Sequence, residues 1–337
     1  MSFWSYNLAA PKLWHSIGNW TPRILRTRPA LYPYTPAELR PYRRLDVSDI
    51  LPICEFWRTH YGDADWYVDA RPAWVRKYLE DPSVIVLGVF TERENILIGT
   101  IVSTPFSGGT TRLDGKIDLS GVRVIEGLCV HSTFRTLGLA GYLITAMDYE
   151  TSIDHPTVHL WSRESRVYPV VSTAFNIQTY AFVPCEQARS PLEPVLLPWS
   201  EMEALWHTHT VHDAQVLAKQ PIRRRGGLEA WAIDTTIVVV SDTKRRTKRT
   251  HDLIWEVTWT GHRTAKGLVP GPVSRIHLET VAKQKRGLMF VTHSHCVDRD
   301  FPEPWQSGTS GYHSWYIYNF VGIQYHNNSI HALREEL

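Results

Sequence analysis

The residue types and spacing that point most clearly to chemistry occur in one turn, Arg135-Thr136-Leu137-Gly138-Leu139-Ala140. A largely β-branched run over residues 122–130 precedes this turn and apolar residues at helical spacing come after it, so the sequence predicts a strand that leads into a helix. The first backbone N–H groups of such a helix lack carbonyl partners and lie at its positive dipole end, where a phosphate group binds well. Gly138 would let the backbone approach a pyrophosphate, Ala140 would keep the helix near the sheet, and Arg135 would donate a charge-assisted hydrogen bond. An ordinary strand–turn–helix with an incidental glycine has the same spacing.

The pattern Arg-x-x-Gly-x-Ala after a strand resembles the acyl-CoA pyrophosphate turn of the GNAT acyltransferases, whose preceding strand splays to admit the thioester. Directly before the turn, Ile125-Glu126-Gly127-Leu128-Cys129-Val130-His131 is similar to the Ile-Asn-Phe-Leu-Cys-Val-His segment of the N-myristoyltransferases, a family of two fused GNAT-like halves. The resemblance implies that Cys129 and Val130, together with all six residues of the turn, contact an acyl-CoA.

Three other short segments resemble the same family, in the same order along the chain. Phe3-Trp4 opens a segment that is similar to the Phe-Trp-x-Thr-Gln-Pro-Val-Pro-Lys-Leu arm, which covers the acyl-CoA in that family. Residues 281–287 are similar to its Leu-Ala-Lys-Met-Lys-Gly, and residues 316–320 to its Tyr-Leu-Tyr-Asn-Trp. The resemblance therefore implies that Phe3 and Trp4 lie against a bound acyl-CoA.

A thioester is already activated, so a transferase must hold it beside an amine, polarise its carbonyl with backbone N–H groups and remove a proton. The resemblance implies that a bulged strand at Gly127 and Leu128 supplies the oxyanion hole and that Ser162 keeps a hydroxyl of the family. It also implies that the C-terminal carboxylate, here that of Leu337, is the general base. Glu126 is the substitute, because it lies beside the oxyanion residues and replaces an amide that cannot take a proton.

Composition sets limits on the class of protein. The 337 residues are 43% hydrophobic and 12% aromatic, which is enough for one large domain or two ordinary ones. No apolar run approaches the roughly 20 residues that span a bilayer, and the Trp-rich N-terminal region lacks signal-peptide order, so we expect a cytoplasmic protein. The four cysteines have no paired spacing, which indicates neither a disulfide framework nor a zinc knuckle. With a net charge of +2, any affinity for polyanions must be local.

Periodicity predicts a mixture of helices and strands, and the resemblance implies that they form an α/β (α+β) fold of two tandem GNAT-like halves in one N-myristoyltransferase-like body. Residues 1–45 would be an extended arm, residues 46–189 the half that binds acyl-CoA, and residues 190–337 the half that receives a peptide and carries the C-terminal carboxylate. The expected helices are 46–58, with Ile50, Leu51, Cys54 and Trp57 on its apolar face, and 72–79, 139–151, 167–175, 199–207, 213–219 and 273–285. Strands are expected at 84–90, 96–102, 122–130, 158–162, 180–183, 230–240, 254–259, 288–292 and 314–320.

Two other groups of residues each allow an ordinary structural interpretation and a functional one. The basic run Lys244, Arg245, Arg246, Lys248 and Arg249 lies between predicted strands and favours a solvated hairpin tip, with a local contact to a polyanion such as ribosomal RNA or an acidic membrane surface as the alternative. Histidine clusters at 207–212 and 293–296 have ligand types that suit zinc. A chain with 16 histidines forms such clusters by chance, so no metal site is expected.

The resemblance implies transfer of a long-chain acyl group from acyl-CoA, myristoyl-CoA in that family, to the N-terminal glycine of a protein or peptide. Two departures leave other functions open. The family's basic Arg-Ser-Lys-Arg turn has a single basic residue here, Arg135, and its acidic loop is reduced to Asp63 and Asp65. The alternatives are a catalytically silent relative that serves as a structural or interaction protein in a large assembly, and a GNAT acetyltransferase that acts on a small amine.

Overall fold

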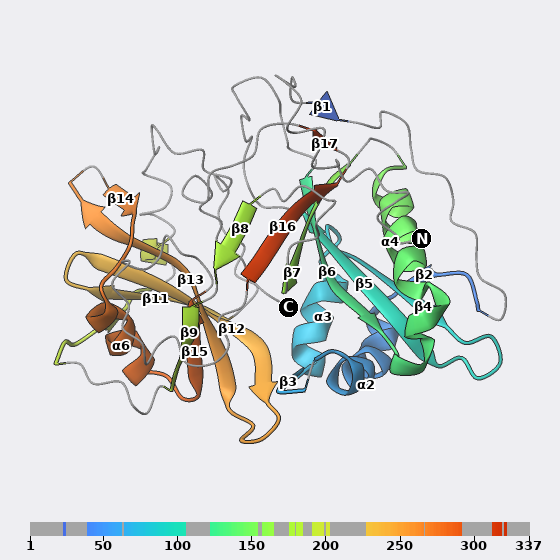
Figure 1. The fold of residues 1–337 in the computed structure, drawn as a ribbon, viewed down its shortest axis with the longest axis horizontal. Helices are drawn as coiled ribbons and strands as arrows, with labels where there is room; N and C mark the ends of the chain where they lie inside the picture. Colours follow the sequence, from blue (N-terminus) through green and yellow to red (C-terminus); the bar gives the residue numbers. More distant parts are fainter. Residues whose placement is uncertain are drawn as a thin grey trace.

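A computed structural model describes residues 23–24, 39–62, 64–105, 122–153, 157–164, 175–178, 180–184, 191–198, 200–202, 227–265, 267–291, 312–318 and 320–321. These residues form two large sheets that lie side by side, one with α2, α3 and α4 and the other with α6 (Figure 1). Phe3, Trp4 and Leu337 lie outside the described residues, as do the helix predicted at 213–219 and both histidine clusters.

The first sheet has seven strands in the order β2-β4-β5-β6-β7-β16-β8. Their bounds are β2 (Arg43–Arg44), β4 (Ile85–Phe90), β5 (Leu97–Pro105), β6 (Val122–Val130), β7 (Val158–Glu164), β16 (Tyr312–Tyr318) and β8 (Phe175–Gln178). Every neighbouring pair is antiparallel except β6 and β7, which are parallel. A parallel pair needs a long crossover, and here α4 (Leu139–Thr151) supplies it.

Helices cover both faces of this sheet. α2 (Ile50–His60) and α3 (Pro72–Glu80) pack on one face, and α4 packs on the other, where Leu139, Leu143 and Met147 are fully buried. Asp46 caps the 3₁₀ turn η2 (Val47–Asp49) that leads into α2, because its side chain accepts from the backbone N–H of Ser48.

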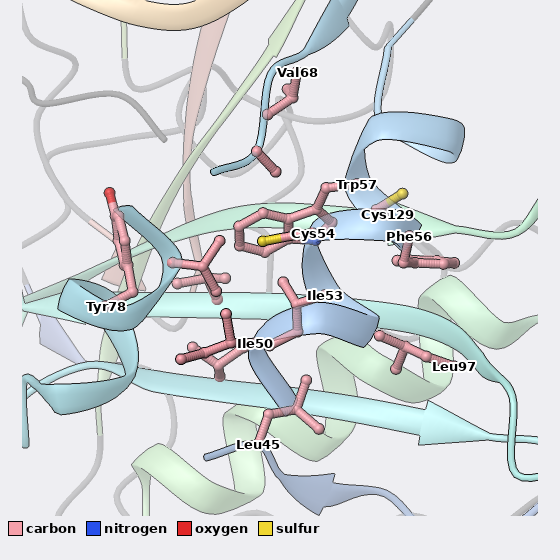
Figure 2. Close-up of a cluster of buried hydrophobic side chains, with 14 of the residues drawn as sticks. Leu45, Ile50, Ile53, Cys54, Phe56, Trp57, Val68, Tyr78, Leu97 and Cys129 are labelled. Carbon is pink, nitrogen blue, oxygen red and sulfur yellow. The ribbon is translucent and has the colours of Figure 1, made fainter. Parts of the chain in front are cut away.

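The apolar face predicted for α2 was wrong at one position. Leu51 is 70% exposed, whereas Ile53 and Phe56 are buried beside Ile50, Cys54 and Trp57 (Figure 2). At 100° per residue these five side chains occupy one arc, and Leu51 lies on the opposite side of the helix.

The second sheet has eight strands, in the order β10-β11-β12-β13-β15-β9, with β14 paired to β13 and β3 paired to β12. Their bounds are β10 (Val195–Leu196), β11 (Leu228–Ile233), β12 (Thr236–Thr247), β13 (Leu253–Thr264), β15 (Leu288–Val291), β9 (Tyr180–Pro184), β14 (Gly267–Pro270) and β3 (Trp66–Val68). α6 (Arg275–Lys283) packs against this sheet through Leu278, Val281 and Ala282.

Two predicted elements differ from the structure. The apolar run 230–240 reverses at Asp234, where φ is 52°, so it contributes to two strands, β11 and β12. Phe175, predicted to end a helix, begins β8, and the rest of that helix lies outside the described residues. Neither a glycine nor a proline marks the turn at Asp234, so the sequence lacked the usual hairpin signal there.

The sheets exchange strands across residue 190, where the sequence predicts a boundary. β9 precedes that residue and pairs in the second sheet, whereas β16 comes after it and lies between β7 and β8 in the first. β3 joins β12, and β1 (Arg23–Ile24) pairs with β17 (Phe320–Val321). Sheet hydrogen bonds therefore tie the two sides of the molecule together in addition to the linker.

Candidate functional site

A β-bulge interrupts the central strand where the family resemblance implies one. Thr100 of β5 is opposite Cys129 and Val102 is opposite Glu126, so the single residue between them on β5 faces two on β6, Gly127 and Leu128. Gly127 has a φ of 56°, a left-handed conformation that glycine adopts without a steric cost.

Two buried polar side chains hold this bulge. The Thr100 hydroxyl donates to the Gly127 carbonyl at 3.1 Å, and Nε1 of Trp57 donates to the Thr100 oxygen at 2.9 Å. Trp57 lies between α2 and the sheet, with Cys54 and Cys129 in the same buried cluster (Figure 2). Because an unpaired polar group in this core would be costly, the relay from helix to threonine to carbonyl fixes the Gly127 peptide group.

The bulge begins where β6 and β7 stop pairing. Their parallel pairing runs from Val122 opposite Val158 to Ile125 opposite Trp161, and in the described part of the chain no strand pairs with that edge of β6 beyond Ile125. We call this place the split. Leu128 lies at the split and is 37% exposed, whereas residues 123–127, 129 and 130 of β6 are buried or half-buried.

The predicted turn continues the chain as a 3₁₀ helix, η3 (Ser132–Leu137), and a left-handed Gly138 at the start of α4. Gly138 has φ 74° and ψ 10°. Apart from Gly138 and its two chain neighbours, no heavy atom of the described residues lies within 4 Å of the position where a Cβ on Gly138 would be. The first turn of α4 therefore begins at an uncovered glycine, which leaves room for a ligand group at the positive end of the helix dipole.

The side chains of the turn divide into exposed and buried sets. Arg135 is exposed, and its Nε donates to the Val130 carbonyl at 3.2 Å. Leu137 is 57% exposed, whereas Leu139 is fully buried in the core beneath α4. Leu139 can therefore meet a ligand only through its backbone, and Val130 is likewise buried at 9% exposure.

A pair of histidines flanks the turn, and no local pattern in the sequence indicated a role for the first of them. The rings of His60, the last residue of α2, and His131, the N-cap of η3, have centroids 4.1 Å apart. Burial lowers the pKa of His60, and the nearby His131 and Arg135 lower it further.

The two described cysteines near the site are thiols. Burial raises the pKa of Cys129 to about 12, although Arg135 acts in the opposite direction, and burial also raises the pKa of Cys54. Because the thiolate is the nucleophilic form, neither residue suits covalent catalysis.

The remaining candidate residues lie around the split. Glu126 is buried and lies opposite Val102, so its side chain is on the face covered by α2 and α3. Ser162 of β7 comes directly after Trp161, the last residue paired with β6, and lies opposite Trp315 of β16. Both positions therefore flank the place where the two central strands separate.

The basic run forms one arm of the β12–β13 hairpin and has partners within the chain. Lys244 forms an ion pair with Asp242 at 2.8 Å, and Arg246 pairs with Asp69 at 2.7 Å. The Arg245 guanidinium lies 4.2 Å from the Trp66 ring centroid. Lys248 and Arg249 are exposed at the hairpin tip, and contact with a polyanion there stays a prediction.

The described residues contain neither a group of metal ligands nor a helix that could span a membrane. In that part of the chain, no group of three or more His, Cys, Asp or Glu side chains is placed to hold a metal ion. None of the described helices is long and apolar enough to cross a membrane.

Neither a protein-family model nor a curated protein matches the chain in sequence. Its structure nevertheless matches Saccharomyces cerevisiae N-myristoyltransferase with bound myristoyl-CoA, at a TM-score of 0.66 and 11% identity, over 96% of this chain and 93% of that one. A second structure of the yeast enzyme with myristoyl-CoA gives a TM-score of 0.68 at 10% identity, over 96% and 88% of the two chains. The chain has an N-myristoyltransferase-like fold.

This N-myristoyltransferase-like fold confirms the predicted α/β architecture of two GNAT-like halves in one body, in a divergent sequence. Two of the motifs that indicated it lie at the bulge and the Gly138 turn, where backbone geometry demands particular residues. The supporting residues Trp57, Thr100 and His60 were missed, because each acts through a partner far away in the sequence.

Proposed function

We propose that this protein transfers a long-chain acyl group, myristoyl in the first instance, from acyl-CoA to the N-terminal glycine of a protein or peptide. The observation that carries the proposal is the bulge at Gly127, which coincides with the β6–β7 split and leads into the uncovered Gly138 turn. The yeast enzyme whose fold this chain shares was solved with myristoyl-CoA bound.

The first half would bind the acyl-CoA. Its pyrophosphate would lie over the first turn of α4, with Arg135 donating to a phosphate oxygen. The thioester would enter the split, where the backbone N–H groups at Gly127 and Leu128 polarise its carbonyl. Phe3 and Trp4 would cover the cofactor, as the sequence resemblance implies.

The chemistry needs one proton acceptor and no protein nucleophile. The acceptor ammonium loses a proton to the base, and the amine attacks the thioester carbon. The tetrahedral intermediate then collapses: the carbon–sulfur bond breaks, the nitrogen gives up its second proton, and the leaving CoA thiolate takes up that proton. A pKa of about 12 keeps Cys129 protonated, which favours this direct transfer over an acyl-cysteine intermediate.

Two carboxylates are candidates for the base. The resemblance favours the C-terminal carboxylate of Leu337, threaded into the site. Glu126 is the alternative within the described residues, because it immediately precedes the bulge and is buried on the face covered by α2 and α3. Ser162 would orient the acceptor or the thioester from the opposite strand.

Calorimetry with acyl-CoAs of increasing chain length tests the proposal. We expect binding to strengthen toward the myristoyl chain, and Arg135→Ala to cost about 1.5–3 kcal/mol of binding free energy through a lost charge-assisted contact. Arg93→Ala, in the exposed β4–β5 turn, is the matched control. Strongest binding of acetyl-CoA would instead favour an acetyltransferase. Absence of binding to any acyl-CoA near millimolar concentration would favour a silent structural relative.

A further inference from the structure

Four aromatic rings form a continuous row between the end of α2 and the turn. Phe56 lies 5.1 Å from His60, His60 lies 4.1 Å from His131, and His131 lies 5.5 Å from Phe134, measured between ring centroids. Both histidines are half-buried, and Arg135 lies exposed beside them. Three side chains that can carry positive charge therefore gather at the turn, and only Arg135 is charged at every physiological pH.

The row is held in place from both ends. Nδ1 of His131 accepts the backbone N–H of Thr133 at 3.3 Å, so the neutral ring carries its proton on Nε2. His60 ends α2, whose C-cap Tyr61 donates its backbone N–H to the Trp57 carbonyl. These contacts hold the backbone segments that carry the two rings.

Burial lowers the pKa of His60, and repulsion from neighbouring positive charge lowers it further, so both favour the neutral ring in the ligand-free protein. The charged groups that act on it are His131 and Arg135 from the β6–η3 junction, and no carboxylate of the described residues is among them. Arg58 lies two residues earlier on the same helix, and Cys129, in one buried cluster with Phe56, has a raised thiol pKa. A phosphate dianion would reverse this balance, because opposite charge within a few ångströms favours the protonated ring.

We propose that His60, with His131 and Arg135, forms a phosphate-binding cluster beside the turn, in which His60 takes up a proton from solvent when a phosphate group of CoA binds. The inference rests on the proposed function, since the phosphate belongs to the acyl-CoA. Binding that takes up one proton strengthens as the pH falls, by at most about tenfold per pH unit. The cluster would thus raise the affinity for CoA at mildly acidic pH and lower it at alkaline pH.

A second histidine pair provides an internal control. His262 of β13 and His277 of α6 lie near each other, and burial and His262 lower the pKa of His277. There Asp234 acts in the opposite direction, and both rings have hydrogen-bond partners in the chain: Ser274 for His277, and Thr236 and the Pro272 carbonyl for His262. A pair that faces a carboxylate has no reason to attract phosphate, so His277→Gln matches His60→Gln without touching the cluster.

The experiment is titration calorimetry of the full chain with CoA between pH 6 and 8, in buffers of different ionisation enthalpy. The buffer dependence of the heat counts protons. We expect the wild type and His277→Gln to take up close to one proton near pH 7, and His60→Gln to take up none while still binding CoA at pH 8. Dephospho-CoA, which lacks the 3′-phosphate, identifies the phosphate group that the cluster binds. If proton uptake is lost with dephospho-CoA, the cluster binds the 3′-phosphate; if proton uptake is kept, it binds the pyrophosphate. Each of these two results supports the cluster.

Proton uptake that is unchanged in His60→Gln, or absent from the wild type, would overturn the cluster and leave acyl-CoA binding intact. A wild type that does not bind CoA at any pH would overturn both the cluster and the proposed function. Should His60→Gln not fold, the imidazole C–H resonances of the wild type give the same answer. The titration of one histidine should move to higher pH when CoA is added, and its constancy would refute the proposal.

Discussion

Both sheets contain the same arrangement of three strands. The edge of the central strand is left unpaired in the described part of the first sheet and is covered in the second. In the first, β6 pairs antiparallel with β5 and, for four residues, parallel with β7; in the second, β13 pairs antiparallel with β12 and, over Ile254–Val257, parallel with β15. Each central strand has a bulge soon after its parallel stretch, at Gly127 in β6 and at Thr258 in β13. The arrangement is a structural repeat that the sequence shows only as a succession of elements.

Beyond the bulge the two central strands differ. β13 continues to Thr264 and turns back as β14, which pairs with Gly261 to Thr264 on the edge that β15 leaves. β12 occupies the other edge up to His262, so β14 lies where the split would be. In the first half, β6 instead ends in η3 and the Gly138 turn. The second half has therefore covered the strand edge that stays unpaired in the described part of the first half.

The surroundings of two glycines differ in the same way. A Cβ on Gly261 would lie 2.4 Å from the Trp259 ring and 2.6 Å from the Val269 carbonyl of β14, whereas a Cβ on Gly138 would meet no described atom within 4 Å. Gly261 is needed for packing and Gly138 only for its backbone conformation. The same arrangement of three strands is thus a candidate site in one sheet and part of a packed core in the other. The element that lies against the bulge makes the difference.

The largest expected effect concerns catalysis on the open side. Removing Glu336 and Leu337 should lower kcat by roughly 10²–10⁴, the usual range for a lost general base, with little change in Kd for acyl-CoA. Acyl transfer to a glycine-terminated peptide is the measurement. Full activity after truncation would transfer the role to Glu126, which Glu126→Gln then tests. Glu256→Gln, at a buried carboxylate of β13 in the closed half, is the control.

Substitution of the two glycines tests the contrast directly. Gly261→Ala should cost about 3 kcal/mol of unfolding free energy, since neither the buried Trp259 ring nor the β14 backbone can move aside. Gly138→Ala should cost about 1 kcal/mol from its left-handed conformation, and it should reduce acyl-CoA affinity. Urea denaturation measures both, and the reverse order of stability would contradict the comparison.

Removal of the threonine hydroxyl at the bulge should be nearly as costly. Thr100→Val keeps the shape but leaves the Trp57 N–H and the Gly127 carbonyl without this partner, for about 1–2 kcal/mol. Since the Gly127 peptide would then be less fixed, kcat should fall more than acyl-CoA affinity. Thr260→Val, on β13, also removes a buried hydroxyl but should leave kcat unchanged. Equal loss of kcat in both variants would show that the bulge has no special role.

The smallest effect is acid sensitivity. His60 and His277 have pKa values below the ordinary 6.5 in the folded protein, so the unfolded chain binds protons more readily as the pH falls below 6.5. The contribution of these two histidines to the free energy of unfolding should be fully present above that pH. It should decline below it, by less than about 1.4 kcal/mol per pH unit for each histidine. CoA should offset the decline due to His60 and leave that due to His277. Thermal unfolding between pH 5 and 8, with and without CoA, checks this.

Local patterns were sufficient to predict the elements that position the site. The run from Val122 to Thr151 forms the predicted strand, turn and helix, because alternating and 3.6-residue periods report backbone geometry directly. The bulge was implied only by the resemblance around Gly127, since no local rule distinguishes this glycine from an incidental one.

Features that depend on distant partners were not predictable. Trp57, Thr100 and Gly127 meet across three elements, and β16 joins β7 over about 150 residues of chain. The burial of Leu139 and the exposure of Leu51 likewise depend on which neighbour each helix packs against. Periodicity gives the width of an apolar stripe but not its rotation about the helix axis.

The position of β16 has a consequence for how the protein is made. A ribosome must synthesise residue 318 before the strand between β7 and β8 can be inserted, so the first sheet stays incomplete during most of translation. Until then β7 and β8 present open edges, which other nascent chains can pair with. A fragment that ends near residue 190 would keep these edges permanently, and it should aggregate rather than behave as an independent acyl-CoA-binding module.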